Sequence, residues 1–376
     1  MNVMIWTAVG IVLALVLFLV VSNGLIQRKV KQAGPDEVWQ FVQNHAAGGR
    51  AALTVRLNGE NIVNVNGDRR MPLASTVKII VAIEYARQAA DGRIDPEQEV
   101  RLEALRSFYV PKTDGGAHEA WLRSLQDTYP GGSVPLSEVA AGMIAYSSNA
   151  NTDYLLQQLG LKNVNSVLSL FGLDQHEPVY PLASTLFVPV RWMNEQQWSK
   201  KKTIQAVAQM NAADYRQRSI DIFNQWENTP PTPEERKQMY GFMSLAYQRI
   251  WSDRLTRSTT DDYVSLLEKL NSKAFLPDEV HTFLDPVMEQ IMKAPANQDW
   301  LVHGGKKGGS TAFVLTEAMY ATAKDGTELA LAFFTDKLNP IEQAKLSRSL
   351  NEFELALLRD GTFRDKTIEQ LRSVNS

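Results

Sequence analysis

Cysteine is absent from the 376-residue sequence, and its absence removes several classes of chemistry. Disulfide frameworks, thiolate zinc sites, iron–sulfur clusters and a cysteine nucleophile are all excluded. The compartment stays open, because exported proteins can also do without disulfides. Histidine is scarce: the five residues are scattered, and no two of them are four residues apart. The sequence therefore predicts no metal site.

A strong charge of one sign is also lacking, since the formal net charge is −3 at pH 7. Proteins that bind the phosphates of nucleic acids carry basic patches and a high pI. We therefore expect no nucleic-acid partner for this chain.

The first 27 residues contain no charged side chain, and Val3–Val21 is almost wholly apolar. About 20 apolar residues are enough for a helix to cross the hydrocarbon core of a bilayer. A cleaved signal peptide would need a basic start, a shorter apolar stretch and small residues at a cleavage site, and none of these is clear here. Residues 1–31 are therefore interpreted as a transmembrane anchor with a basic flank.

Four segments have the alternation typical of β-strands, two near each end of the chain: Ala51–Leu57, Asn61–Val65, Thr311–Tyr320 and Glu328–Phe334. Asn58-Gly59 between the first two predicts a two-residue hairpin turn. Helices are expected at 36–45, 75–90 and 340–359, and the periodicity is mostly helical from about 137 to 292. This order indicates an α+β fold, in which one antiparallel sheet is formed from both chain ends with an inserted helical region.

A serine is followed by a lysine three residues later at Ser75 and Lys78, in the expected first turn of a helix. Residues with this spacing share a helix face, so the lysine amine can reach the serine hydroxyl. A serine hydroxyl is a weak nucleophile until a base takes its proton, and a buried lysine with a lowered pKa can do so. The alternative is a serine N-cap beside a solvated lysine.

Two further elements follow in the chain. Ser147-Ser148-Asn149 begins a helical stretch, and Lys306-Lys307-Gly308-Gly309-Ser310 leads into an apolar strand. A hydroxyl and an amide from one loop, with a lysine and glycines on an edge strand, could line two sides of a cleft holding Ser75. Glycines at an edge strand let a substrate backbone lie close to it.

In this order the three elements resemble the S-x-x-K, S-D-N and K-T-G motifs of the class A β-lactamase and penicillin-binding serine hydrolase superfamily. The resemblance covers roughly residues 51–359. It implies that Ser75 is the acylated nucleophile and Lys78 its partner. It further implies that Ser147 passes a proton to the leaving group and that Asn149 holds the substrate amide, with Ser148 replacing the usual aspartate.

The third element has two possible registers. We favour Lys307-Gly308-Gly309-Ser310 over the register that begins at Lys306, because it keeps a hydroxyl after the second glycine. The resemblance then implies that Lys307 and Ser310 bind a substrate carboxylate. Gly309 lies beside the substrate, and the Ser310 N–H is the second oxyanion donor.

Two positions are weaker matches to the superfamily. Glu177 is the only glutamate near the expected place of the loop base that directs water in class A β-lactamases, but Val179–Leu182 lacks the partner asparagine. A solvated loop carboxylate is the preferred alternative. Tyr109 falls where these enzymes place an aromatic residue at the cleft rim, and a surface aromatic is an equal alternative.

The resemblance implies a membrane-anchored serine hydrolase, with residues 32–376 as the hydrolase domain and a helical insertion at about 192–257. The expected substrate is a β-lactam or a peptidoglycan-like amide, cleaved through a Ser75 acyl-enzyme without metal or organic cofactor. The alternatives are a catalytically degenerate relative that binds cell-wall peptides, and a D-alanyl-D-alanine peptidase or esterase.

Such a substrate places the domain on the periplasmic, extracytoplasmic side of the membrane. Arg28, Lys29 and Lys31 argue against this orientation, because basic residues after a span tend to stay in the cytoplasm.

Overall fold

The computed structural model describes residues 28, 30–226, 228–372 and 374. The predicted membrane span, Val3–Val21, lies outside the described residues. Within the described part of the chain, no helix combines the length and the apolar character that a membrane crossing requires.

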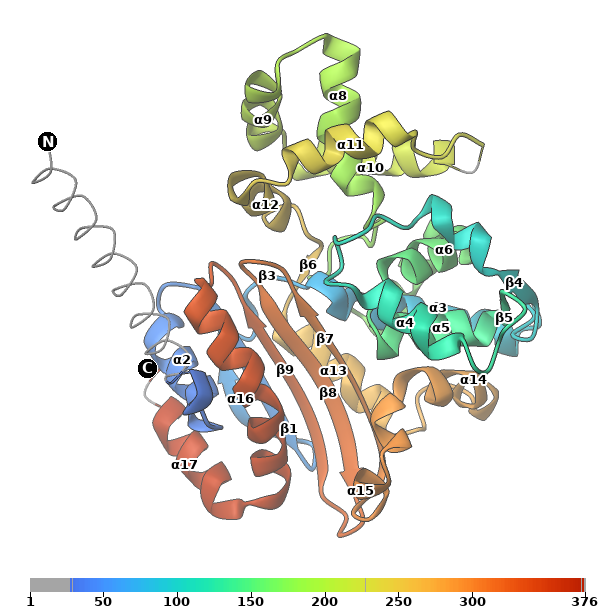
Figure 1. The fold of residues 1–376 in the computed structure, drawn as a ribbon. Helices are drawn as coiled ribbons and strands as arrows, with labels where there is room; N and C mark the ends of the chain where they lie inside the picture. The colour runs from blue at the N-terminus through green and yellow to red at the C-terminus, as the bar shows by residue number, and fades with distance from the viewer. Residues whose placement is uncertain (1–27, 29, 227, 373, 375–376) are drawn as a thin grey trace, which may run out of the picture.

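A five-stranded antiparallel sheet is built from both ends of the chain, in the order β2-β1-β9-β8-β7 (Figure 1). Its strands are β1 (Ala51–Leu57), β2 (Glu60–Val65), β7 (Leu301–Ser310), β8 (Leu315–Ala323) and β9 (Glu328–Thr335). The α+β class and the assembly of the sheet from both termini are confirmed. Asn58 and Gly59 both have positive φ, 51° and 79°, as the two central residues of the predicted hairpin turn require.

The predicted strand Thr311–Tyr320 is wrong at its beginning. Residues 311–314 form the turn between β7 and β8, and the edge strand expected to hold the lysine and glycines is β7, which precedes this turn. Four of the ten residues of β7 are glycines, and glycine has low β-propensity and contributes no side chain to an alternation. Pairing with β8 nevertheless holds the segment extended as the edge of the sheet.

Strand β9 shows how the sheet separates two cores, because alternate side chains enter different clusters. Leu331 and Phe333 join one apolar cluster, whereas Ala332 and Phe334 join the other. The first cluster is closed by α2 (Asp36–His45), α16 (Pro340–Arg359) and α17 (Gly361–Arg372), which cover one face of the sheet (Figure 1). The predicted helices 36–45 and 340–359 are thus confirmed, and α17 is an additional one.

On the opposite face, α13 (Thr260–Asn271) packs on the sheet, and α3 (Lys78–Ala90) lies in the same apolar core among most of the remaining helices. These are α4 (Ala117–Leu125), α5 (Leu136–Ala145), α6 (Asn149–Leu159), α7 (Leu161–Phe171), α14 (Asp278–Met288) and α15 (Pro295–Gln298). Short two-stranded ladders join β3 (Met71–Pro72) to β6 (Arg257–Ser258) and β4 (Glu99–Arg101) to β5 (Ser133–Pro135).

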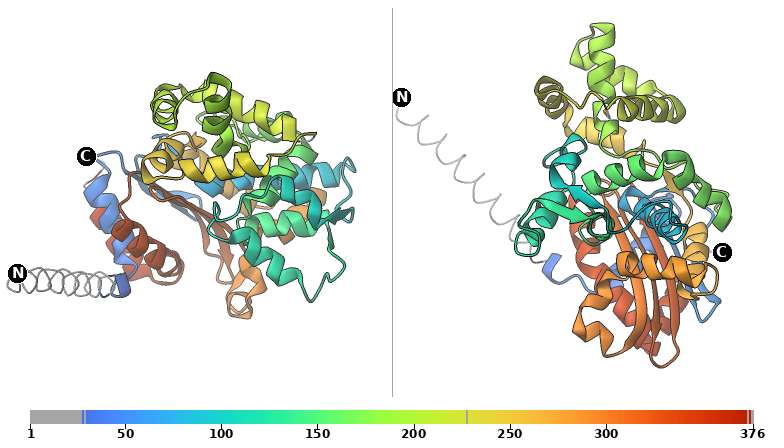
Figure 2. Two further views of the ribbon diagram at one scale, coloured as in Figure 1. Left: turned by 45° about the horizontal axis from the view of Figure 1, so that its top comes forward. Right: turned by 90° about the vertical axis from the view of Figure 1, so that its right-hand side faces the viewer.

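Residues 188–252 form a separate helical module that lies beyond one end of the sheet in every view (Figures 1 and 2). Its helices are α8 (Val188–Gln196), α9 (Lys200–Gln209), α10 (Ala212–Trp226), α11 (Pro233–Phe242) and α12 (Leu245–Ser252). Phe223 and Trp226 of α10 pack on Phe108, at 5.7 and 6.3 Å between ring centroids, and connect the module to the rest of the molecule. The segment predicted as an insertion is therefore helical, and its status as an insertion stays a prediction.

Candidate active site

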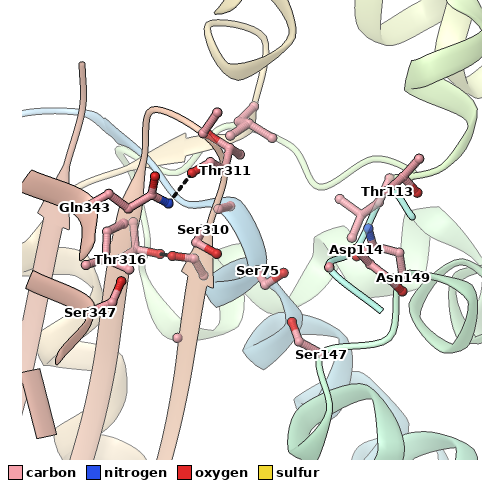
Figure 3. A pocket seen from close by; sticks show the side chains of 18 of the residues that line it. Ser75, Thr113, Asp114, Ser147, Asn149, Ser310, Thr311, Thr316, Gln343 and Ser347 are labelled. Carbon is pink, nitrogen blue, oxygen red and sulfur yellow. Dashed lines mark hydrogen bonds between the residues drawn. The ribbon is translucent and has the colours of Figure 1, made fainter. Parts of the chain in front are cut away.

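Ser75 lies in a short 3₁₀ turn (Ala74–Val77) that leads directly into α3. The preceding residue, Ala74, has a positive φ of 45°, a costly conformation for a residue with a Cβ atom. Among the described residues, the Ser75 hydroxyl has no hydrogen-bond partner, and its side chain points into an open cleft (Figure 3). The serine is therefore free to meet a ligand.

Lys78 is completely buried one turn after Ser75. Its Nζ donates to Ser147 O at 2.5 Å, to Ser147 Oγ at 3.2 Å and to Asn149 Oδ1 at 2.9 Å. It makes no hydrogen bond with Ser75 Oγ in the described structure, contrary to the expectation from spacing. Burial and the nearby charge of Lys307 hold the pKa of the Lys78 amine well below its usual 10.5.

Ser147 and Asn149 come from the loop between α5 and α6 and face Ser75 across the cleft (Figure 3). Ser147 has a positive φ of 69°, which turns its hydroxyl and its carbonyl toward the lysine. Ser148, between them, is fully buried and caps α6: its Oγ accepts from Asn151 N at 3.2 Å and donates to Asn151 Oδ1 at 2.8 Å. The middle residue of this motif is therefore structural in its contacts.

Gly309 of β7 lies against the backbone of Ser75. A Cβ atom at this position would stand 2.4 Å from Ser75 N and 2.9 Å from Leu73 O, closer than real Cβ contacts allow. The N–H of Thr311 donates to Val314 O across the hairpin, so the N–H of Ser310 points the other way, to the unpaired edge of β7. Ser75 and Ser310 thus both line the cleft, and the Ser310 N–H lies at the unpaired edge of β7.

The two lysines of β7 lie on opposite faces of the strand. Lys306 pairs with Glu354 of α16 at 2.7 Å and with Glu317 at 3.7 Å. Lys307 is buried on the side of Lys78, with its Nζ 2.8 Å from Gly308 O. Burial, partly offset by Glu317, lowers the pKa of Lys307 to about 8. This geometry favours the register Lys307-Gly308-Gly309-Ser310.

These elements border one cleft of about 620 Å³. Among the predicted site residues, its walls contain Ser75, Ser147, Asn149, Gly309 and Ser310, with Lys78 and Lys307 buried next to them (Figure 3). Residues separated by more than 200 positions in the chain therefore meet around one serine hydroxyl.

A model of the beta-lactamase enzyme family matches residues 37–353. The chain belongs to this family. Among solved structures, a beta-lactamase from Sphaerobacter thermophilus is similar, with 20% identity and a TM-score of 0.55 over 87% of this chain and 97% of that one. A beta-lactamase from Chitinophaga pinensis has 18% identity and a TM-score of 0.50 over 84% and 98% of the two chains. No curated protein sequence matches.

Glu177 is not brought to the site as the family's loop base. Its Oε2 accepts from Arg257 N at 3.2 Å and lies 3.5 Å from Arg216 Nη2, and the residue is not part of the cleft wall. Two partners therefore hold this carboxylate between β6 and the helical module. Its contacts are those of a structural ion pair, and the expectation of a catalytic base at Glu177 finds no support in its position.

Tyr109 also lies outside the cleft wall. Its ring packs on His118 at 4.5 Å between centroids, and its carbonyl accepts a hydrogen bond from Arg236 of the helical module. The residues that do form this rim are Lys112, Thr113, Asp114 and Gly115, a few positions later in the same loop.

Two carboxylates near the site are not among the residues predicted from the sequence. Asp114 lines the cleft, but it accepts from the N–H groups of Gly116, Ala117 and His118 and so begins α4. Asp153 is fully buried one helical turn after Asn149, a spacing that could have signalled it.

Asp153 accepts from Leu182 N at 2.8 Å and from Ala183 N at 2.7 Å. Burial raises its pKa to about 7, and the Lys78 charge opposes this rise. Its contacts fix the loop whose Leu182 side chain borders the cleft.

Proposed function

We propose that the protein is a membrane-anchored serine hydrolase that cleaves a β-lactam or a peptidoglycan-like amide through an acyl-enzyme on Ser75. The observation that carries the proposal is the convergence at one cleft of an unpartnered serine hydroxyl, a buried lysine of lowered pKa and the unpaired edge of β7 at Ser310. Nucleophile, base and oxyanion donors are the groups that acyl transfer requires.

In the proposed acylation, the neutral amine of Lys78 takes the Ser75 proton, directly or through Ser147 Oγ, which lies 3.2 Å from Lys78 Nζ. Ser75 Oγ then attacks the carbonyl carbon, and the negative charge that develops on its oxygen is stabilised by the N–H groups of Ser75 and Ser310. When the C–N bond breaks, Ser147 donates its proton to the leaving nitrogen and regains one from Lys78. The nitrogen keeps that proton, departing as an amine from a peptide-like amide and staying tethered to the acyl group in an opened β-lactam, and Lys78 is neutral again.

The remaining polar groups would orient the substrate. Asn149 uses its Oδ1 to accept from Lys78, so its amide N–H groups are available for a substrate carbonyl. Lys307, charged below its pKa of about 8, and the exposed hydroxyl of Ser310 would attract a substrate carboxylate. These roles are the ones that the family resemblance assigns.

Deacylation is the step for which the site is poorly equipped. Within the described residues, the carboxylates of the cleft wall are Asp114, which accepts from N–H groups at the start of α4, and Glu317 of β8, which lies 3.7 Å from Lys306. Leu182, an apolar side chain, borders the cleft instead of a base, and Glu177 is held elsewhere. We therefore infer a long-lived acyl-enzyme with β-lactams, as in a penicillin-binding protein or a D-alanyl peptidase.

Intact-protein mass spectrometry of the full chain in lipid nanodiscs, incubated with benzylpenicillin, tests this function. The parent protein should gain the mass of one opened penicillin and keep it for hours after removal of the drug. The Ser75→Ala variant should gain no mass. Rapid return to the unmodified mass would establish a working β-lactamase and refute the long-lived intermediate. Absence of an adduct with penicillins, cephalosporins and a serine-directed phosphonate would refute acyl transfer at Ser75.

We also propose that residues 1–31 anchor the protein with its cleft on the extracytoplasmic side. Resistance of the chain to alkaline carbonate extraction, together with cleavage by protease added to intact spheroplasts, is the expected result. Release by carbonate would contradict the anchor, and protection from protease would contradict the orientation.

A further inference from the structure

Part of the cleft wall is apolar, although the chemistry above uses only polar groups. Five side chains form this apolar wall: Ala74, Leu182, Met243, Trp251 and Leu255. Ala74 and Leu255, each 8% exposed, pack with Val314 in a small cluster separate from the two large cores, and Trp251 packs against it. Because Ala74 directly precedes Ser75, this apolar surface begins at the nucleophile itself.

Other parts of the same cleft wall are polar. Thr113, Asp114, Ser147 and Asn149 face Ser75 from the loops before α4 and α6 (Figure 3). Ligand sites combine apolar surface, which supplies affinity, with a few polar groups that fix orientation. A cleft that combines the two kinds of wall fits a ligand with both an apolar group and hydrogen-bonding groups.

The helical module supplies the outer part of the apolar wall. Met243 lies at the turn between α11 and α12, and Trp251 lies near the end of α12. The Trp251 indole N–H donates to Thr185 Oγ1 at 3.0 Å, which satisfies its polar atom and fixes the ring. Both side chains are partly exposed, so they offer apolar area that a ligand can cover.

Contacts at both rims of the cleft hold the module in place. On the β7 side, Ser252 Oγ lies 2.9 Å from Thr311 Oγ1, next to Ser310, and Arg249 of α12 lies 3.6 Å from Asp336. On the other side, Arg236 of α11 donates to Tyr109 O at 2.5 Å, and Tyr240 OH donates to Pro111 O at 3.0 Å. A wall fixed at both edges is preorganised, so a ligand does not have to order it on binding.

We propose that the helical module completes an apolar subsite beside Ser75, and that this subsite selects acyl donors bearing a bulky aromatic or branched aliphatic group near the reacting carbonyl. The inference rests on the proposed acyl transfer at Ser75 and adds the class of substrate. Burial of one such group against a rigid apolar wall discriminates it from a methyl group by about tenfold or more.

Non-covalent binding to full-chain Ser75→Ala in lipid nanodiscs, measured by calorimetry, tests the subsite without requiring acylation. The two probes are penicillins that differ only in the side-chain acyl group, phenylacetyl against acetyl. We expect the phenylacetyl compound to bind about tenfold more tightly. Adding Met243→Ser or Leu255→Ala should reduce this ratio to within about twofold, because each substitution removes apolar wall area.

Leu245→Ser is the matched control, since Leu245 lies on α12, is 67% exposed and is not part of the cleft wall. It should leave the affinity ratio unchanged. Met243 lies on a surface turn, so its variant remains informative if Leu255→Ala fails to fold. Equal binding of the two probes, or equal loss of both in the wall variants, would overturn the subsite. The expected ratio in Ser75→Ala, combined with a parent protein that never acylates, would refute the proposed function and leave the subsite standing.

Discussion

The close packing of Gly309 on Ser75 leads to a quantitative prediction for Gly309→Ala. The added Cβ would lie 2.4 Å from Ser75 N, whereas ordinary contacts begin at 3.4 Å, so β7 or the Ser75 turn must move by about 1 Å. The atoms in the way are largely backbone, which cannot rotate aside. That movement separates the N–H of Ser310 from that of Ser75.

Loss of one oxyanion donor costs about 10²- to 10³-fold in rate, and a misplacement of about 1 Å is worth about 10²-fold. We therefore expect benzylpenicillin to acylate Gly309→Ala at least about 100-fold more slowly than the parent. Mass spectrometry of samples quenched at successive times measures this rate.

Gly308→Ala is the matched control, one residue away on the same strand. Its Cβ would meet Glu317 Oε2 at 3.1 Å, the end of a side chain that can shift. We expect its acylation rate to stay within about fivefold of the parent, well short of the loss of an oxyanion donor. Acylation of Gly309→Ala near the parent rate, or an equal loss in both variants with unchanged melting temperatures, would refute the placement of the oxyanion site.

Four further predictions concern charge and capping. The rate of acylation by a neutral activated ester should fall as the pH is lowered and Lys78 becomes protonated. Lys307→Gln should move this fall in rate to higher pH, because it removes a like charge near Lys78. Asp153→Asn should move it to lower pH, because it removes an opposite charge. With a carboxylate-bearing substrate, the parent should also lose affinity as pH rises through about 8, where Lys307 loses its proton; opposite or absent shifts would contradict the lysine assignments. Ser148→Ala should lower the free energy of unfolding in urea by about 1–2 kcal/mol and Ser148→Asp by less, since only the first removes the cap of α6; equal losses would contradict a capping role. Glu177→Gln should leave acylation and deacylation within about twofold of the parent, because its partners are Arg257 and Arg216; a stalled acyl-enzyme in this variant alone would restore Glu177 as the base.

The sequence predicts local structure well where the period of the apolar residues is clear. The hairpin at Asn58-Gly59 and the helices at 36–45 and 340–359 have strong turn, cap and periodicity signals, and the structure contains them. Strand β7 has none of these, because glycines interrupt its pattern and only its pairing with β8 defines it. Edge strands that approach a ligand closely often contain glycine, so their composition predicts the strand poorly.

Motif spacing alone did not identify the site. Ser199 and Lys202 have the same spacing as Ser75 and Lys78, but Ser199 accepts the N–H of Lys202 as the cap of α9, at the far side of the module. The difference lies in tertiary structure: burial of Lys78 and its contact with the loop of Ser147 are products of packing. Glu177 shows the opposite difference between sequence and structure. It is close in sequence to Leu182, which lines the cleft, but its carboxylate binds Arg257 N and lies outside the cleft wall.

Peptide-level mapping of the penicillin adduct tests the central claim most directly. The full chain is labelled with benzylpenicillin, digested and sequenced by tandem mass spectrometry, with Ser75→Ala treated in parallel. The account predicts a single modified residue, Ser75, and no modification of Ser147 or Ser310 in either protein. An adduct on another residue, or one that persists in Ser75→Ala, would contradict it.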